Sequence, residues 1–155
     1  IIGVGHNFLR KKILREVEAK LKRNIKWATI ISKNSILQEN VSIGEGTIIV
    51  ANTVINTGTI IGKHCLINTS SSIDHHNNFK NFSSTGPGVI TGGNVKIGEM
   101  SHLSIGSIIK NNINIKSNAL IGGSSFVNND CDKNSVYYGV PAKKIRLRKE
   151  NEEYL

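Results

Sequence analysis

The sequence is poor in cysteine, proline and aromatic residues, and it has no long apolar run. Two cysteines, Cys65 and Cys131, are too few for a disulfide scaffold. No run approaches the roughly eighteen apolar residues of a membrane-spanning helix, and no secretory leader pattern opens the chain, so we predict no membrane partner and a cytoplasmic location. Aromatic residues make up only 5% of the chain. Layers of small aliphatic side chains must therefore fill the core.

Acidic residues are also scarce, with 11 against 20 lysines and arginines, which gives a net charge of +9. Such an excess suggests nucleic-acid binding, so its distribution matters. The excess lies in residues 1–30 and 143–155, whereas residues 31–142 carry seven basic and six acidic side chains. A nearly neutral middle argues against a binding stripe for a duplex, and we predict no nucleic-acid partner.

A strict six-residue period runs through most of the chain. Fifteen of seventeen positions spaced by six are large and apolar, and a small or β-branched residue follows most of them by four. A helix would repeat at 3.6 and a simple strand at 2. The positions are Ile31, Leu37, Ile43, Ile49, Ile55, Ile61, Ile67, Ile73, Phe79, Thr85, Thr91, Ile97, Leu103, Ile109, Ile115, Ile121 and Val127.

This period predicts an all-β solenoid. Each hexad is one short strand plus a turn, with the apolar residue pointing inward and Gly or Asn accepting the tight turn conformation. Three hexads close one triangular rung, so residues eighteen apart stack at the strand spacing of ~4.8 Å. Seventeen hexads give between five and six rungs.

The flanks differ from the solenoid. Residues 1–5 and 25–31 are predicted as short strands around a basic amphipathic helix over 8–23, a partial strand-helix-strand α/β segment that cannot build a sheet of its own. We therefore expect further residues upstream. The predicted division is residues 1–30 as the remnant of an α/β nucleotide-sugar-binding domain, 31–136 as the solenoid, and 137–155 as a closing segment with a polar tail.

Several motifs resemble the hexapeptide superfamily of sugar O- and N-acyltransferases. Within it, they are similar to the sialic acid O-acetyltransferases and the N-acetyltransferases of nucleotide-linked 4-amino sugars. The resemblance spans essentially the whole chain and implies a left-handed parallel β-helix. It rests on the hexads, Gly139-Val140-Pro141-Ala142-Lys143, Ile67-Asn68-Thr69, Asp74-His75, Gly86-Pro87-Gly88, Gly92-Gly93 and Gly5-His6-Asn7.

The resemblance implies acetyl transfer from acetyl-CoA to an amino or hydroxyl group of a sugar in surface-glycan biosynthesis. His75 matches the family's catalytic base, and a neutral imidazole suits the removal of a proton from an attacking nucleophile. Rung arithmetic places Gly93 eighteen residues on, directly over His75. The Gly93 backbone N–H is therefore a candidate donor to the developing oxyanion.

Two positions depart from the family pattern. The acidic residue that usually follows the catalytic histidine is His76 in this sequence, which leaves Asp74 as a candidate for orienting the base. The histidine that the family often has near the acetyl group is Ser84, whose hydroxyl can donate one hydrogen bond. Asn68 matches the family's asparagine in the same network.

The resemblance also implies the remaining contacts. Ile105 and Gly123, eighteen apart, match positions that line the pantetheine groove of coenzyme A. Gly5, Asn7 and Arg10 are candidates for contacting the sugar or nucleotide-sugar. A homotrimer is implied, with each active site between neighbouring subunits.

Two other hypotheses stay open. A zinc enzyme similar to γ-type carbonic anhydrases needs three histidines, but His64, His75, His76 and His102 fall on different faces or levels, so no metal site is predicted; His64 and His102 are expected to be surface residues. A non-catalytic or degenerate scaffold is compatible with His76 and Ser84.

Overall fold

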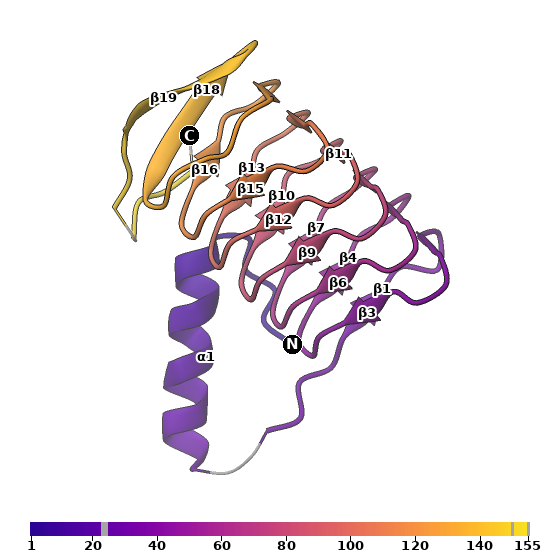
Figure 1. Cartoon of the computed structure of the whole chain (residues 1–155). Helices are drawn as coiled ribbons and strands as arrows, with labels where there is room; N and C mark the ends of the chain where they lie inside the picture. Colours follow the sequence, from indigo (N-terminus) through magenta and orange to yellow (C-terminus); the bar gives the residue numbers. More distant parts are fainter. Residues whose placement is uncertain (23–24, 150, 155) are drawn as a thin grey trace.

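The computed structural model describes residues 1–22, 25–149 and 151–154. Short coils stack into a β-solenoid of about six turns, with helix α1 (Asn7–Leu21) beside it and a hairpin at its carboxyl-terminal end (Figure 1). The solenoid predicted from the hexads is confirmed. Within the described ranges, no helix is both long and apolar enough to cross a membrane.

The strands form three sheets, which we call A, B and C. Sheet A holds β1 (Ile30–Ile31), β4 (Ile48–Ile49), β7 (Leu66–Ile67), β10 (Ser84–Thr85), β13 (His102–Leu103), β16 (Leu120–Ile121), β18 (Ser135–Gly139) and β19 (Ala142–Leu147). Sheet B holds β2 (Ile36–Leu37), β5 (Val54–Ile55), β8 (Ser72–Ile73), β11 (Ile90–Thr91), β14 (Ile108–Ile109) and β17 (Phe126–Val127). Sheet C holds β3 (Ser42–Ile43), β6 (Ile60–Ile61), β9 (Asn78–Phe79), β12 (Lys96–Ile97) and β15 (Asn114–Ile115).

The register places residues eighteen apart side by side. Ile30 pairs with Ile48, and the same offset recurs in all three sheets. From Ile49 to Val127 the inward hexad positions are at most 2% exposed, so each coil buries the layer of the next. We name the turns between successive strands the A–B, B–C and C–A corners.

The small hexad residues point into the core and satisfy turn carbonyls. The Thr47 hydroxyl donates to the Gly62 carbonyl at 2.8 Å, and the Thr59 hydroxyl donates to the Asp74 carbonyl at 2.9 Å. Buried carbonyls need such partners. This explains why serine and threonine recur at a position where packing alone would accept alanine.

Left-handed backbone conformations recur at the corners, mostly at Asn and Gly, as the hexads predict. The glycines that directly follow the apolar residues have another reason. A Cβ on Gly44 would lie 2.6 Å from the backbone of Gly62 in the next coil. Close approach of adjacent coils, and not a positive φ, therefore requires glycine at this position.

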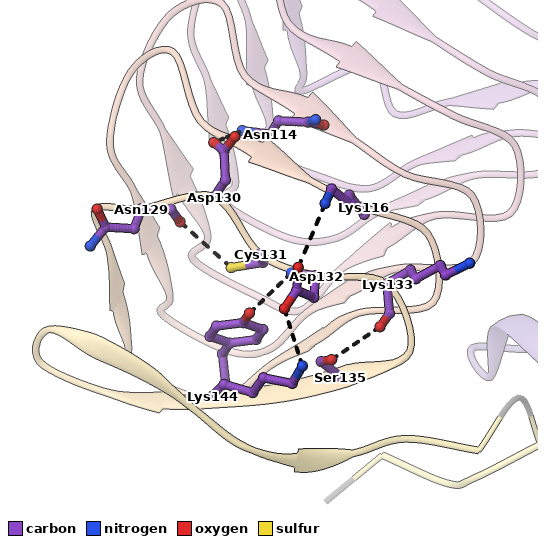
Figure 2. A network of polar contacts seen from close by, with 10 residues as sticks. Asn114, Lys116, Asn129, Asp130, Cys131, Asp132, Lys133, Ser135 and Lys144 are labelled. Atoms are coloured by element: carbon purple, nitrogen blue, oxygen red, sulfur yellow. Dashed lines mark hydrogen bonds and ion pairs between the residues drawn. The ribbon is translucent and has the colours of Figure 1, made fainter.

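The last turn is shorter than the others. Leu120 pairs with Val136, an offset of sixteen residues, and Cys131 bridges to Ile115 where a further strand would lie. Figure 2 shows the polar network that holds this turn. Asp132 pairs with Lys144 at 3.1 Å and with Lys116 at 3.6 Å. The segment from β18 through β19 then folds over the end of the solenoid as an antiparallel hairpin.

The amino-terminal segment contains one helix, but fewer strands than predicted. Residues 1–4 form no strand because no neighbouring strand pairs with them among the described residues, and only Ile30–Ile31 of the second predicted strand is paired. The helix begins at Asn7, with the His6 imidazole accepting from Leu9 N–H. The predicted end at Arg23 lies outside the described residues; Lys22, at φ 47°, caps the helix.

Arg10 anchors helix α1 to the solenoid. Its side chain is 1% exposed, and its five N–H groups all donate. Nε donates to the His64 carbonyl at 2.8 Å, and the two Nη groups reach Asn7 and three further carbonyls. Because the guanidinium is buried and all of its donors are hydrogen-bonded, Arg10 is a structural anchor.

We expect Arg10→Met to lower the free energy of unfolding by about 3 kcal/mol or more, because buried carbonyls lose their donors. Arg15→Met, at an exposed position of the same helix, should change it by less than about 0.5 kcal/mol. Urea unfolding measures both. Equal effects of the two substitutions would contradict the anchoring role.

Candidate functional site

His75 lies at a B–C corner, two residues after the end of β8, and its side chain is exposed. It lines a groove of about 590 Å³ together with Asp74, Gly92, Gly93 and Asn111, which come from this coil and the next two. A Cβ on Gly93 would lie 2.5 Å from Cε1 and Nε2 of His75. The predicted stacking of Gly93 on His75 is therefore confirmed, and only glycine leaves room for the imidazole in this position.

The Gly93 N–H has no hydrogen-bond partner among the described residues, whereas its carbonyl accepts from Asn112 N–H at 2.9 Å. An unpaired donor beside the imidazole is suited to an oxygen that gains negative charge. The groove thus combines a proton acceptor with a backbone donor.

Asp74 and His76 take different positions around the base. The Asp74 carboxylate accepts from Asn56 Nδ2 at 3.0 Å and from the His75 backbone N–H at 2.8 Å. These two hydrogen bonds lower the pKa of Asp74. The carboxylate therefore braces the turn, and the hydrogen bonds it makes do not include the His75 ring.

His76 is the residue that contacts the imidazole. Nδ1 of His75 and Nδ1 of His76 lie 3.0 Å apart, so one of the two must carry the proton. When His76 accepts, His75 holds its proton on Nδ1, and its Nε2 lone pair is free to act as a base. A neutral imidazole then occupies the place that the family pattern gives to a carboxylate.

Asn68 lies elsewhere, at an A–B corner after β7. It lines a second groove, of about 380 Å³, with Gly5, Gly86, Ile105 and Tyr154. A Cβ on Gly123 would lie 3.3 Å from the Ile105 side chain, which confirms the predicted stacking of these two. Within one chain, His75 and Asn68 line separate grooves, one at each end of the strands of sheet B.

The two hexad positions that are not apolar support these two corners. The Thr85 hydroxyl oxygen accepts from Asn68 N–H at 2.8 Å, and the Thr91 hydroxyl oxygen accepts from Asp74 N–H at 3.3 Å. An apolar side chain at either place would leave a corner amide without this partner. The breaks in the hexad pattern thus fall where the candidate site residues need support.

Ser84 does not open into either groove. It is 0% exposed, and its hydroxyl lies 2.8 Å from Nδ1 of His102, one coil further on. The Tyr154 ring stacks on His102 at 3.9 Å between centroids.

The expectation that His102 and His64 are surface residues is wrong. His102 is half-buried beneath Tyr154, and His64, 3% exposed, packs between Trp27 and Phe82.

Burial and the nearby guanidinium groups of Arg148 and Arg10 lower the pKa of His102 to about 3. The unfolded imidazole takes up a proton near pH 6.5, so below that pH the unfolded state binds more protons than the native state. Stability should therefore fall as the pH drops from 6.5 toward 3. We expect a loss of about 2–3 kcal/mol at pH 4.5 relative to pH 7.5, measured by urea unfolding. His102→Phe should have a smaller pH dependence, and an unchanged one would contradict this assignment.

Arg10 and Asn7 do not face a substrate in this chain. Both are 1% exposed, and Asn7 Nδ2 donates to the carbonyls of Met100 and Ser101. Their predicted role in substrate binding is corrected to that of an anchor. Both are buried, and every N–H of the Arg10 guanidinium already donates to a group of the protein. Gly5 alone of the three lines a groove.

Of the four histidines considered as zinc ligands, only the neighbours His75 and His76 lie together. His64 is at a C–A corner, His75 at a B–C corner and His102 in sheet A. Across the described residues, no group of three or more His, Cys, Asp or Glu side chains is arranged to hold a metal ion.

No protein-family model matches the chain, but its structure is similar to solved acyltransferases. A variant of perosamine N-acetyltransferase from Caulobacter crescentus, in complex with CoA and GDP-perosamine, matches with a TM-score of 0.89 and 25% identity over 94% of this chain and 68% of that one. The acetyltransferase domain of PglB from Neisseria gonorrhoeae, in complex with acetyl coenzyme A, matches with 0.85 and 25% over 92% and 68%. This chain has the hexapeptide-repeat β-helix fold and is similar to nucleotide-sugar N-acetyltransferases at about 25% identity.

AntD, an N-acyltransferase from Bacillus cereus, shares the fold of this hexapeptide-repeat protein, with a TM-score of 0.73 and 19% identity over 87% of this chain and 89% of that one.

Some residues of the grooves were not predicted from the sequence. Lys110 and Asn111 line the His75 groove, and adding eighteen to Gly92 and Gly93 would have found them. Tyr154 carries no such signal, because the tail follows no period.

Proposed function

We propose that this protein transfers an acetyl group from acetyl-CoA to an amino or hydroxyl group of a sugar, either a nucleotide-linked 4-amino sugar or sialic acid. The observation that carries the proposal is the His75 imidazole lying over the Gly93 backbone in an open groove. Related proteins of 25% identity bind CoA with GDP-perosamine, or acetyl coenzyme A. The structural similarity supports an acyl donor of the same kind for this chain.

In the proposed reaction, the sugar amine or hydroxyl attacks the thioester carbonyl directly. Nε2 of His75 takes the proton that the nucleophile loses, and the Gly93 N–H donates to the oxyanion of the tetrahedral intermediate. Collapse of this intermediate expels the CoA thiolate, which takes the proton from Nε2 of His75 and so restores the base. No covalent enzyme intermediate is needed. His76 holds the proton of His75 on Nδ1, so that Nε2 faces the groove.

We propose that a second copy of the chain completes the site. The His75 groove and the Asn68 groove flank sheet B, whose outer face exposes Ile36, Ile90 and Ile108 by 43–55%. An exposed apolar stripe of this kind is typical of an interface. In the proposed homotrimer, the Asn68 groove of one subunit, with Ile105 and Gly123, meets the His75 groove of the next, and acetyl-CoA lies between them.

The test follows free CoA released from acetyl-CoA with UDP- and GDP-linked 4-amino sugars and with free sialic acid as acceptors. Turnover with one acceptor and not with its acetylated form supports the proposal. CoA binding without turnover on any acceptor favours the alternative, a degenerate scaffold. This alternative rests on Ser84, which is buried and stands where the family often has a histidine near the acetyl group. If CoA does not bind, acetyl-CoA is rejected as the acyl donor, and the groove is rejected as its binding site.

A further inference from the structure

A third cavity lies at the C–A corner, between helix α1 and the chain that returns after β19. It measures about 330 Å³ and is lined in part by Lys11, Glu99, Asn118, Asn134 and Arg148. None of its lining residues lines the His75 groove or the Asn68 groove. What it holds is therefore separate from the acetyl-transfer chemistry proposed above.

Arg148 is the unusual side chain of this cavity. It is 5% exposed, its guanidinium lies 5.4 Å from the Tyr154 ring centroid, and one Nη donates to the Glu152 carbonyl at 3.2 Å. Its Nε and its other Nη are buried and have no hydrogen-bond partner among the described residues. Buried donors without partners are costly, and burial lowers the pKa of Arg148. Two donor groups of the cation thus have no acceptor among the described residues.

Asn118 adds an acceptor to the same cavity. It is 6% exposed, and its Nδ2 donates to Oδ1 of Asn134 at 3.0 Å, which fixes the amide. Its Oδ1 is buried and has no partner among the described residues. Lys11 is paired with Glu99 at 2.7 Å, so these two charges offset one another. The remaining charge of the lining is that of Arg148.

We propose that this cavity binds a small oxyanion that also carries a hydrogen-bond donor, of which hydrogen phosphate is the simplest. The anion oxygens would accept from Arg148, and the protonated oxygen would donate to Asn118. A water molecule could bond to the same atoms, but it would bring no negative charge to the guanidinium. The volume is at the lower end of that of ligand pockets, so a phosphate monoester of a small molecule also fits.

The position of the cavity predicts what binding does. Its wall comes from helix α1, from corners of the solenoid and from the returning chain at Arg148, so an anion would join three segments that are far apart in sequence. A ligand that binds only the native state raises the free energy of unfolding by RT ln(1 + [L]/Kd), and the unfolding temperature rises with it. Phosphate binding should therefore stabilise the full chain.

The experiment titrates inorganic phosphate at pH 6 into the full chain at fixed ionic strength, by calorimetry and thermal unfolding, with sulfate as the comparison. Sulfate carries no proton at this pH, so it should bind more weakly. Arg148→Lys shortens the donor and should weaken phosphate affinity by about tenfold or more. Lys149→Gln removes a neighbouring exposed charge and should leave the affinity unchanged.

A second variant keeps the test valid if Arg148→Lys does not fold. Asn118→Asp is nearly isosteric and adds a negative charge to the cavity, so it should abolish phosphate binding. Saturating CoA should not displace phosphate, because CoA is proposed to bind elsewhere. The proposal is overturned if phosphate shows no binding beyond that of sulfate, if Lys149→Gln weakens binding as much as Arg148→Lys, or if CoA competes.

Discussion

His75→Ala is expected to lower turnover by about 10²–10⁴-fold, the range found when a general base is removed. The imidazole is the proposed proton acceptor, and its Nε2 faces the groove beside Gly93. The variant should still bind CoA, because the side chain is exposed and is not part of the core. Free-CoA release under saturating acceptor measures the loss.

His76→Ala is the matched variant for this prediction. It removes the Nδ1 contact that sets the His75 tautomer but leaves the base in place, so its loss of turnover should be smaller than that of His75→Ala. Turnover that survives His75→Ala within threefold would remove His75 from the mechanism. If His76→Ala loses more turnover than His75→Ala, then His76 is the general base and His75 sets its tautomer.

Gly93→Ala is expected to lower turnover by about 10²-fold while leaving the fold intact. The added Cβ would lie 2.5 Å from the His75 ring, so the imidazole must rotate away from the groove. Displacement of a reacting group by about 1 Å costs rate of this order. The ring is exposed and free to move, so the free energy of unfolding should change by less than about 1 kcal/mol.

Gly92→Ala provides the contrast to Gly93→Ala. Its Cβ would lie 2.7 Å from the backbone nitrogen of Asn111, and backbone of the adjacent coil cannot move as a side chain can. This variant should lose about 1–3 kcal/mol of stability, as overpacked cores do. Kinetics and urea unfolding of both variants separate the two effects. Full activity in Gly93→Ala would show that the observed position of His75 is not needed.

The hexad pattern was enough to predict the solenoid and the stacking of Gly93 on His75. A coil repeats every eighteen residues, so the neighbour of any residue in the next coil stands at a fixed offset along the chain. Contacts between adjacent coils can therefore be predicted from residue numbers alone. The same rule gave the stacking of Ile105 on Gly123. The hydrogen bonds by which Thr85 and Thr91 support the two candidate corners were found only in the structure.

The roles of helix α1 and of the carboxyl-terminal tail could not be predicted and became visible in the folded chain. Asn7 bonds to Met100, 93 residues away, and His6 bonds to Glu152, 146 residues away. These contacts follow no period, so no offset in the sequence encodes them. The resemblance implied a substrate contact for Arg10, whereas the structure shows a buried anchor. In the same way, the returning tail buries His102 beneath Tyr154 and leaves Arg148 in the cavity with two donors that have no partner among the described residues.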